Sequence, residues 1–149
     1  MGKRVEFYQA GKISLMNTKY LMTTSSLTLT IAGLFALFAP DILLTTLGAS
    51  PSMPLAVPVQ LMGSLYFAFA LVNWTAKDSA IGGIYARPVS LGNFAHFFSG
   101  ALILLKYSLS NSFNLAVLSM TMMYVLFAVL FYWLVFRATG LPKEKADQK

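Results

Sequence analysis

A few polar side chains interrupt the long apolar segments of this sequence, and they are its first candidates for chemistry. Asn73 lies near the end of one apolar run, and Asn93 and His96 lie within the next. Arg87 stands between the two runs, directly before Pro88. Polar groups inside apolar segments are costly in lipid, so each is a candidate functional residue. We expect these four side chains to line one polar pocket that can bind a ligand.

Small residues flank His96 along its segment. Gly92 and Gly100 lie one helical turn before and after it, and small side chains let a second helix or a ligand approach closely. Three interpretations of His96 remain open. It can make a hydrogen-bonded helix–helix contact, which is the ordinary role of such a residue. It can instead bind a ligand or a lipid head group, or it can transfer protons.

Other chemistry finds little support in the residue types. The chain has no cysteine and one histidine, which excludes thiolate chemistry and bis-histidine haem and leaves zinc or copper short of ligands. The acidic residues are isolated from one another, so no carboxylate pair is available for acid–base catalysis. We expect no metal and no cofactor, and the sequence favours a protein that is not an enzyme.

The elements that must position these residues are four long apolar runs. A hydrocarbon core of about 30 Å needs roughly 20 helical residues, and the backbone of a spanning segment must satisfy its own hydrogen bonds. The predicted spans cover residues 20–39, 55–76, 88–107 and 113–136 of the 149-residue chain. We therefore predict an all-α protein, an integral membrane four-helix bundle that forms a single domain.

Breaks between the spans follow from turn and cap residues. Pro40 and Asp41 are expected to stop the first helix, and Pro88 to begin the third while Gly82 and Gly83 stay in the loop. The segment from Ser110 to Ser112 supplies cap-type residues before the fourth span. Residues 137–149 read as a mobile polar tail.

Orientation follows from the basic residues beside each span. Of the 11 Lys and Arg residues, only Lys106 falls on the side of the first and third loops; the other ten flank the termini and the second loop. Cytoplasmic loops carry the excess of Lys and Arg. Both termini are therefore predicted to be cytoplasmic. The net charge of +6 has this origin, so we expect no nucleic-acid partner.

The middle of the chain resembles a known family. The stretches that carry the resemblance are Gly63-Ser64-Leu65-Tyr66-Phe67-Ala68-Phe69-Ala70 with Asn73-Trp74, Gly82-Gly83-Ile84-Tyr85-Ala86-Arg87-Pro88, and Asn93-Phe94-Ala95-His96-Phe97. They are similar to a family of small four-helix inner-membrane proteins, frequent in the Bacteroidota, for which no activity is known. The resemblance implies the fold and a bacterial inner-membrane location. A fainter likeness, in layout and in the His96-Phe97 pair, is to four-helix sterol-biosynthesis scaffold proteins.

The favoured function is an interaction or accessory protein of the membrane that holds a lipid or another apolar ligand. A second hypothesis is a membrane enzyme or carrier for an amphipathic substrate, such as an isoprenoid, quinone or sterol-like molecule, with its polar end in a pocket that faces the cytoplasm. A third is a small oligomeric transporter. Membrane lipids are the expected partners, together with another membrane protein or further copies of the chain.

Overall fold

The computed structural model of this chain describes residues 2–78, 86–110 and 114–137, with side chains for 18–78, 87–110 and 114–136. Across these residues the chain is all-helical. Its five helices are α1 (Gly2–Phe38), α2 (Pro40–Thr46), α3 (Met53–Ala76), α4 (Ala86–Ser110) and α5 (Leu115–Arg137).

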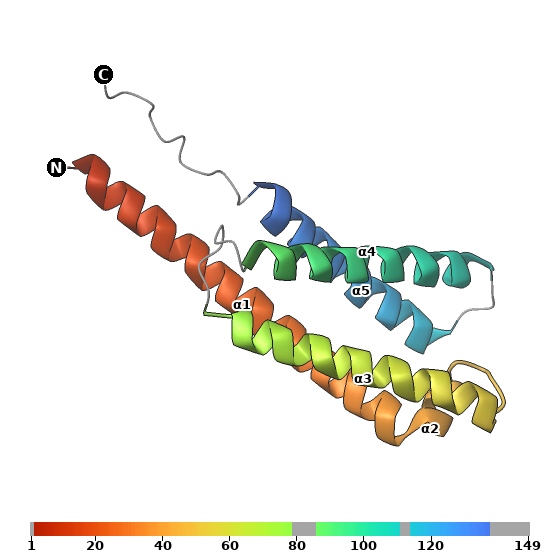
Figure 1. Cartoon of the computed structure of the whole chain (residues 1–149). Coiled ribbons are helices and arrows are strands. Elements are labelled where there is room, and N and C mark those ends of the chain that lie inside the picture. Colours follow the sequence, from red (N-terminus) through yellow and green to blue (C-terminus); the bar gives the residue numbers. More distant parts are fainter. Residues whose placement is uncertain (1, 79–85, 111–113, 138–149) are drawn as a thin grey trace.

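Four of the helices are long and apolar enough to cross a membrane. The spans cover Thr18–Phe38 of α1, all of α3, Arg87–Ser110 of α4 and Leu115–Phe136 of α5. Large apolar side chains are exposed along all four, which suits contact with lipid tails rather than water. The start of α1 and the end of α5 lie at the same end of the bundle (Figure 1), as an even number of spans requires. The chain thus has the make-up of a multi-pass membrane protein.

Helices α1 and α3 form one closely packed antiparallel pair. Their buried positions recur every seven residues, the repeat of two helices that coil around each other: Met22, Leu29 and Ala36 on α1, and Ala56, Gly63 and Ala70 on α3. A methyl group on Gly33 would lie 2.9 Å from the carbonyl oxygen of Gly63, and one on Gly63 would lie 2.8 Å from that of Gly33. The two backbones therefore touch where the glycines meet, as small residues allow in membranes.

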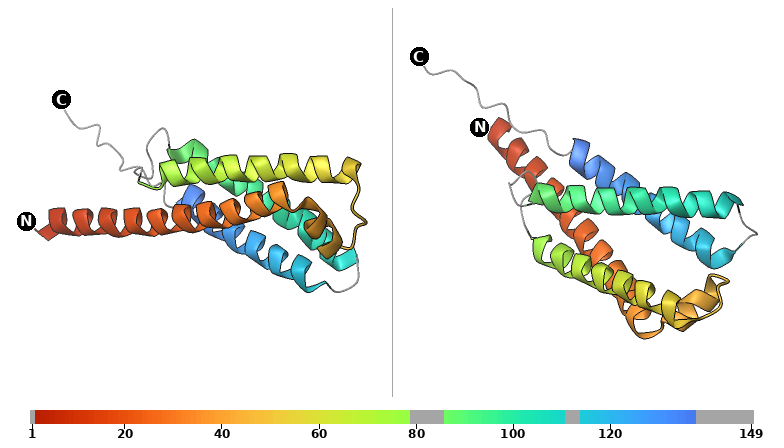
Figure 2. Two further views of the ribbon diagram at one scale, coloured as in Figure 1. Left: turned by 90° about the horizontal axis from the view of Figure 1, so that it is seen from below. Right: turned by 45° about the vertical axis from the view of Figure 1, so that its right-hand side comes forward.

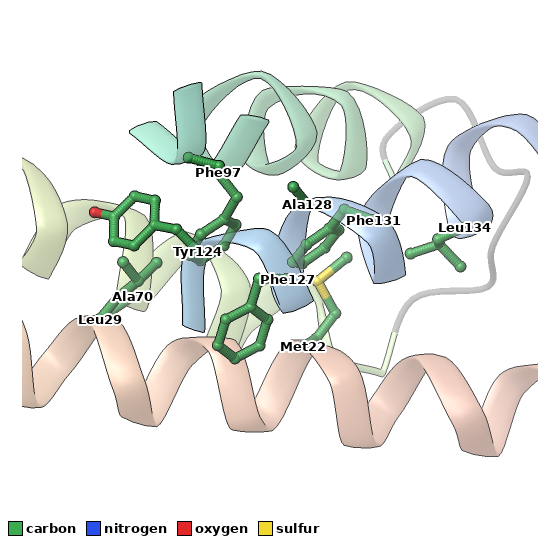
Figure 3. Packing of buried hydrophobic residues seen from close by; sticks show 10 residues of the cluster. Met22, Leu29, Ala70, Phe97, Tyr124, Phe127, Ala128, Phe131 and Leu134 are labelled. Atoms are coloured by element: carbon green, nitrogen blue, oxygen red, sulfur yellow. The ribbon is translucent and has the colours of Figure 1, made fainter. Parts of the chain in front are cut away.

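Helices α4 and α5 form the second pair around aromatic side chains. The Phe97 ring stacks on those of Phe127 and Phe131, with centroids 4.7 and 5.7 Å away. Gly100 leaves room for the Tyr124 ring, whose nearest carbon would lie 2.4 Å from an added methyl group. This cluster also reaches Met22 and Leu29 of α1 (Figure 3), so it joins the two pairs.

The two pairs meet unevenly along their length. Helices α3 and α4 lie nearest each other at the end where they connect and diverge toward the end that carries α2 (Figures 1 and 2). There α2 bridges the pairs: the side-chain amide of Asn114 donates to the Thr46 carbonyl at 3.0 Å, and the Tyr107 hydroxyl to the Leu47 carbonyl at 3.5 Å.

Several element boundaries differ from the sequence prediction. The first helix does end before Pro40, but Pro40 and Asp41 then open the short helix α2, because proline and an acidic residue both suit a first helical turn. Asn114 caps α5: its Oδ1 accepts from the Ala116 and Val117 backbone amides at 2.9 and 3.3 Å. Residues 111 and 112 of the predicted cap segment lie outside the described residues.

Two further boundary predictions concern the third helix and the tail. Helix α4 starts at Ala86, so Pro88 is its third residue rather than its first. Of the predicted tail over 137–149, Arg137 is the last residue of α5. Residues 138–149 of that tail, like Gly82 and Gly83, lie outside the described residues.

Candidate functional site

Two asparagine side chains face each other between α3 and α4. Asn73 Nδ2 donates to Asn93 Oδ1 at 2.8 Å, and Asn93 Nδ2 donates to Asn73 Oδ1 at 2.5 Å. Both side chains are fully buried, at 0% exposure. The two side chains, both expected to line one pocket, therefore contact each other directly. We call these two residues the amide pair.

The amide pair uses its remaining donors within the protein as well. Asn73 Nδ2 also donates to Ser25 Oγ of α1 at 3.1 Å, and Asn93 Nδ2 to the Val89 carbonyl at 2.9 Å. An asparagine amide carries two N–H donors, so all four donors are occupied. One turn deeper, Ser26 Oγ donates to the Ala70 carbonyl at 2.8 Å. The pair thus ties α1, α3 and α4 together and keeps no donor for a ligand.

His96 belongs to a different polar group. Its Nε2 lies 3.4 Å from the Tyr124 hydroxyl of α5, which donates to the Tyr66 hydroxyl of α3 at 2.7 Å. We call Tyr66, Tyr124 and His96 the hydroxyl–imidazole chain. Tyr124 is buried, whereas Tyr66 and His96 are partly exposed. The two ends of the chain therefore reach the surface of the bundle while its middle does not.

Aromatic rings enclose the imidazole. Phe69 stacks on His96 with centroids 5.6 Å apart, and Tyr66 meets it edge-on at 5.3 Å. A methyl group on Gly92 would lie 3.7 Å from the Phe69 ring, so this glycine lies against the Phe69 ring. The glycines before and after His96 thus receive rings from α3 and α5, which agrees with the packing interpretation of those small residues.

The hydroxyl–imidazole chain lies deep in the span. At about 1.5 Å per residue, His96 is about 15 Å from the start of α4 at Ala86. By the same rise, Tyr66 is about 15 Å from the end of α3 at Ala76 and Tyr124 about 14 Å from the start of α5 at Leu115. Each residue falls in the middle third of its helix. A membrane around these spans would place the chain in its hydrocarbon interior.

The other expected pocket residue stands apart. Arg87 is exposed in the first turn of α4, and the described part of the chain gives it no hydrogen bond or ion pair. Gln60, toward the other end of α3, donates to the Leu37 carbonyl of α1 at 3.1 Å. The four predicted site residues therefore divide into the amide pair, His96 in its own chain and Arg87 at the surface.

Charged groups gather where α3 ends. Lys19 Nζ lies 2.7 Å from a carboxylate oxygen of Asp78. The hydrogen bond from Lys19 holds the pKa of the Asp78 carboxyl below its ordinary value. Lys77 Nζ lies 3.0 Å from the centre of the Trp74 ring, an arrangement that suits a membrane interface.

Neither tyrosine of the hydroxyl–imidazole chain was among the site residues predicted from the sequence. Tyrosines of membrane helices are enriched at the interfaces, so Tyr66 and Tyr124, in the middle of apolar runs, were detectable as exceptions. Ser25 was not among the predicted site residues either. Its hydroxyl donates to the Met22 carbonyl at 3.0 Å and accepts from Asn73, a pairing that no local pattern indicates.

Comparison with protein-family models, curated proteins and solved structures finds no match to this chain. The family resemblance of the central segments stays a prediction. Among the described residues, no three His, Asp or Glu side chains gather in a way that could hold a metal ion. The geometry of the two polar groups is therefore what bears on function.

Proposed function

We propose that this protein is an accessory protein of the membrane that holds an apolar ligand taken up sideways from the bilayer. The ligand's polar atom would meet the hydroxyl–imidazole chain. The observation that carries the proposal is that this chain is hydrogen-bonded through three helices, lies in the middle of the span and reaches the surface at Tyr66 and His96. A polar group at that depth is costly unless it has partners or a function.

A pocket that opens at the connected end of α3 and α4 is less favoured. The amide pair would have to form its polar wall, and its donors are all bonded within the protein. The hydroxyls of Thr24 and Ser25 likewise donate to carbonyls of their own helix α1, Thr24 to Tyr20 at 2.9 Å and Ser25 to Met22 at 3.0 Å. They therefore offer little support for a solute path through the bundle.

Native mass spectrometry of protein purified in mild detergent tests the proposal. The wild-type protein should retain an apolar molecule, and the two single variants Tyr66→Phe and His96→Leu should each retain less of it while their helix content stays unchanged. Ser99→Ala is the matched control, because Ser99 is exposed on α4 and its hydroxyl donates to the Ala95 carbonyl of the same helix at 2.8 Å. Equal retention by all four proteins would refute the proposed site.

The proposed setting is the bacterial inner membrane with both termini in the cytoplasm. Ten of the 11 basic residues flank the termini and the connection between α3 and α4, and positive charge is retained on the cytoplasmic side. A reporter fused at the C-terminus should report the cytoplasm, and one inserted between α2 and α3, at Gly48 to Met53, the outside. A periplasmic signal from the C-terminal fusion would contradict this orientation.

A further inference from the structure

The hydroxyl–imidazole chain contains one more donor than its own hydrogen bonds use. Two hydroxyls and a neutral imidazole supply three donor hydrogens, and the chain has two internal contacts, Tyr124 to Tyr66 and His96 to Tyr124. With Tyr124 donating to Tyr66, the hydrogen left over is that of the Tyr66 hydroxyl, and the lone pair left over is that of His96 Nδ1. The described residues provide no partner for either.

Reversal of the chain exchanges these roles. If Tyr66 donates to Tyr124, and Tyr124 donates to His96 Nε2, the spare hydrogen moves to His96 Nδ1, and the Tyr66 oxygen is left to accept. A hydroxyl hydrogen rotates freely, and either nitrogen of imidazole can carry the proton. Each end of the chain can therefore donate or accept, according to what it meets. An unpaired donor in an apolar medium costs several kcal/mol, so the spare hydrogen favours a ligand that accepts it.

The depth of the hydroxyl–imidazole chain and the charge of the spans limit the chemical classes of ligand further. The hydrocarbon core is about 30 Å thick, and lipid ester and head-group oxygens lie at its edges. By the helical rise, these oxygens are more than about 10 Å from the hydroxyl–imidazole chain in the middle third of its helices. No Lys, Arg, Asp or Glu occurs at 20–40, 54–76, 88–105 or 107–136, so a charged ligand would find no counter-ion. The ligand must be neutral and apolar enough to carry an oxygen atom into the bilayer interior.

We propose that the ligand is a quinone with an apolar tail. This inference rests on the proposed function and names its ligand class. A quinone is neutral, partitions into the bilayer interior, and carries oxygens that accept as carbonyls and donate as the hydroxyls of the quinol. The reversible hydroxyl–imidazole chain matches both forms. Tyr66 and the stacked rings of Phe69 and His96 supply aromatic surface for the flat ring of the ligand.

Titration with decylubiquinone and decylubiquinol, with bound fractions read by native mass spectrometry, tests the inference. Wild-type protein should bind both with similar affinity, and Tyr66→Phe should bind both about fivefold more weakly, the factor for one neutral hydrogen bond. Tyr132→Phe is the matched control, since it removes the same atom from an exposed ring on α5 and should match the wild type. Circular dichroism checks that all three proteins fold alike.

The outcomes separate the two proposals. One outcome rejects the quinone alone: the protein purified from membranes retains a phospholipid, or a neutral lipid other than a quinone, that Tyr66→Phe releases, while decylubiquinone binds all three proteins equally. The quinone proposal is then wrong and the proposed function stands. If neither a native molecule nor either probe depends on Tyr66, a buried water occupies the spare donor and both proposals fall. Tyr66-dependent binding of both probes supports both proposals.

Discussion

Replacing Asn73 with leucine removes one half of the amide pair and leaves the other half buried without its partner. Three hydrogen bonds disappear: the two that join Asn73 to Asn93 and the one from Asn73 to Ser25. Side-chain hydrogen bonds between membrane helices average about 0.6 kcal/mol, so the expected loss of stability is about 2 kcal/mol. Asn93→Leu breaks the same two pair bonds and should cost a similar amount.

The double variant distinguishes pairing from independent effects. With both amides gone, no polar side chain of the pair is left unpaired, and leucine is well suited to lipid. Replacing both partners can be nearly neutral where replacing one is costly. We therefore expect the double variant to lose about 2 kcal/mol rather than the additive value of about 4, a coupling within the range seen for residues in contact.

The assay is reversible unfolding of the purified protein in mixed micelles of mild detergent and dodecyl sulfate, followed by circular dichroism. Ser99→Ala, which removes an exposed hydroxyl that bonds within α4, serves as the control and should leave stability unchanged. Additive losses in the double variant would refute the mutual pairing. Loss of ligand from Asn73→Leu, at a temperature where it remains folded, would show that the amide pair does contact the ligand.

Further predictions concern packing and charge. Gly33→Ala should destabilise the protein by about 1–3 kcal/mol in the same unfolding assay, because its methyl group would meet backbone atoms of α3 at 2.9 Å. Gly92→Ala, whose methyl group would lie at an ordinary 3.7 Å from a ring carbon, should not destabilise it. Lys19→Gln should raise the pKa of the Asp78 carboxyl toward its ordinary value, as followed by a carboxyl NMR titration. Because the folded-state pKa is lowered, the ion pair's small contribution is present at neutral pH, is lost as pH falls through that pKa, and weakens with salt. A carboxyl that titrates identically in both proteins would contradict the pairing.

Composition and run length were enough to predict the helical class and the number of spans. Each span is a local property: about 20 consecutive apolar residues leave the backbone no alternative to helix in lipid. The short helix α2 was missed because seven residues give little periodic signal, and its first two residues read equally well as a stop. Asn114 was missed as a cap because several polar residues precede α5, and only the observed geometry shows that the Asn114 side chain accepts from the backbone.

Residue type alone identified Asn73, Asn93 and His96, because polar groups are conspicuous in apolar runs. The assignment of partners depended on how the helices rotate about their axes, which the sequence leaves open when a helix is apolar on every side. Rotation is set by the glycine contact between α1 and α3 and by the aromatic cluster between α4 and α5. That packing turns Asn73 toward Asn93. His96, three residues after Asn93 along α4, turns toward Tyr124 of α5 instead. One expected pocket thereby became a closed amide pair and a separate hydroxyl–imidazole chain, because hydrogen bonds form between groups that packing brings within about 3 Å, whatever their order in the chain.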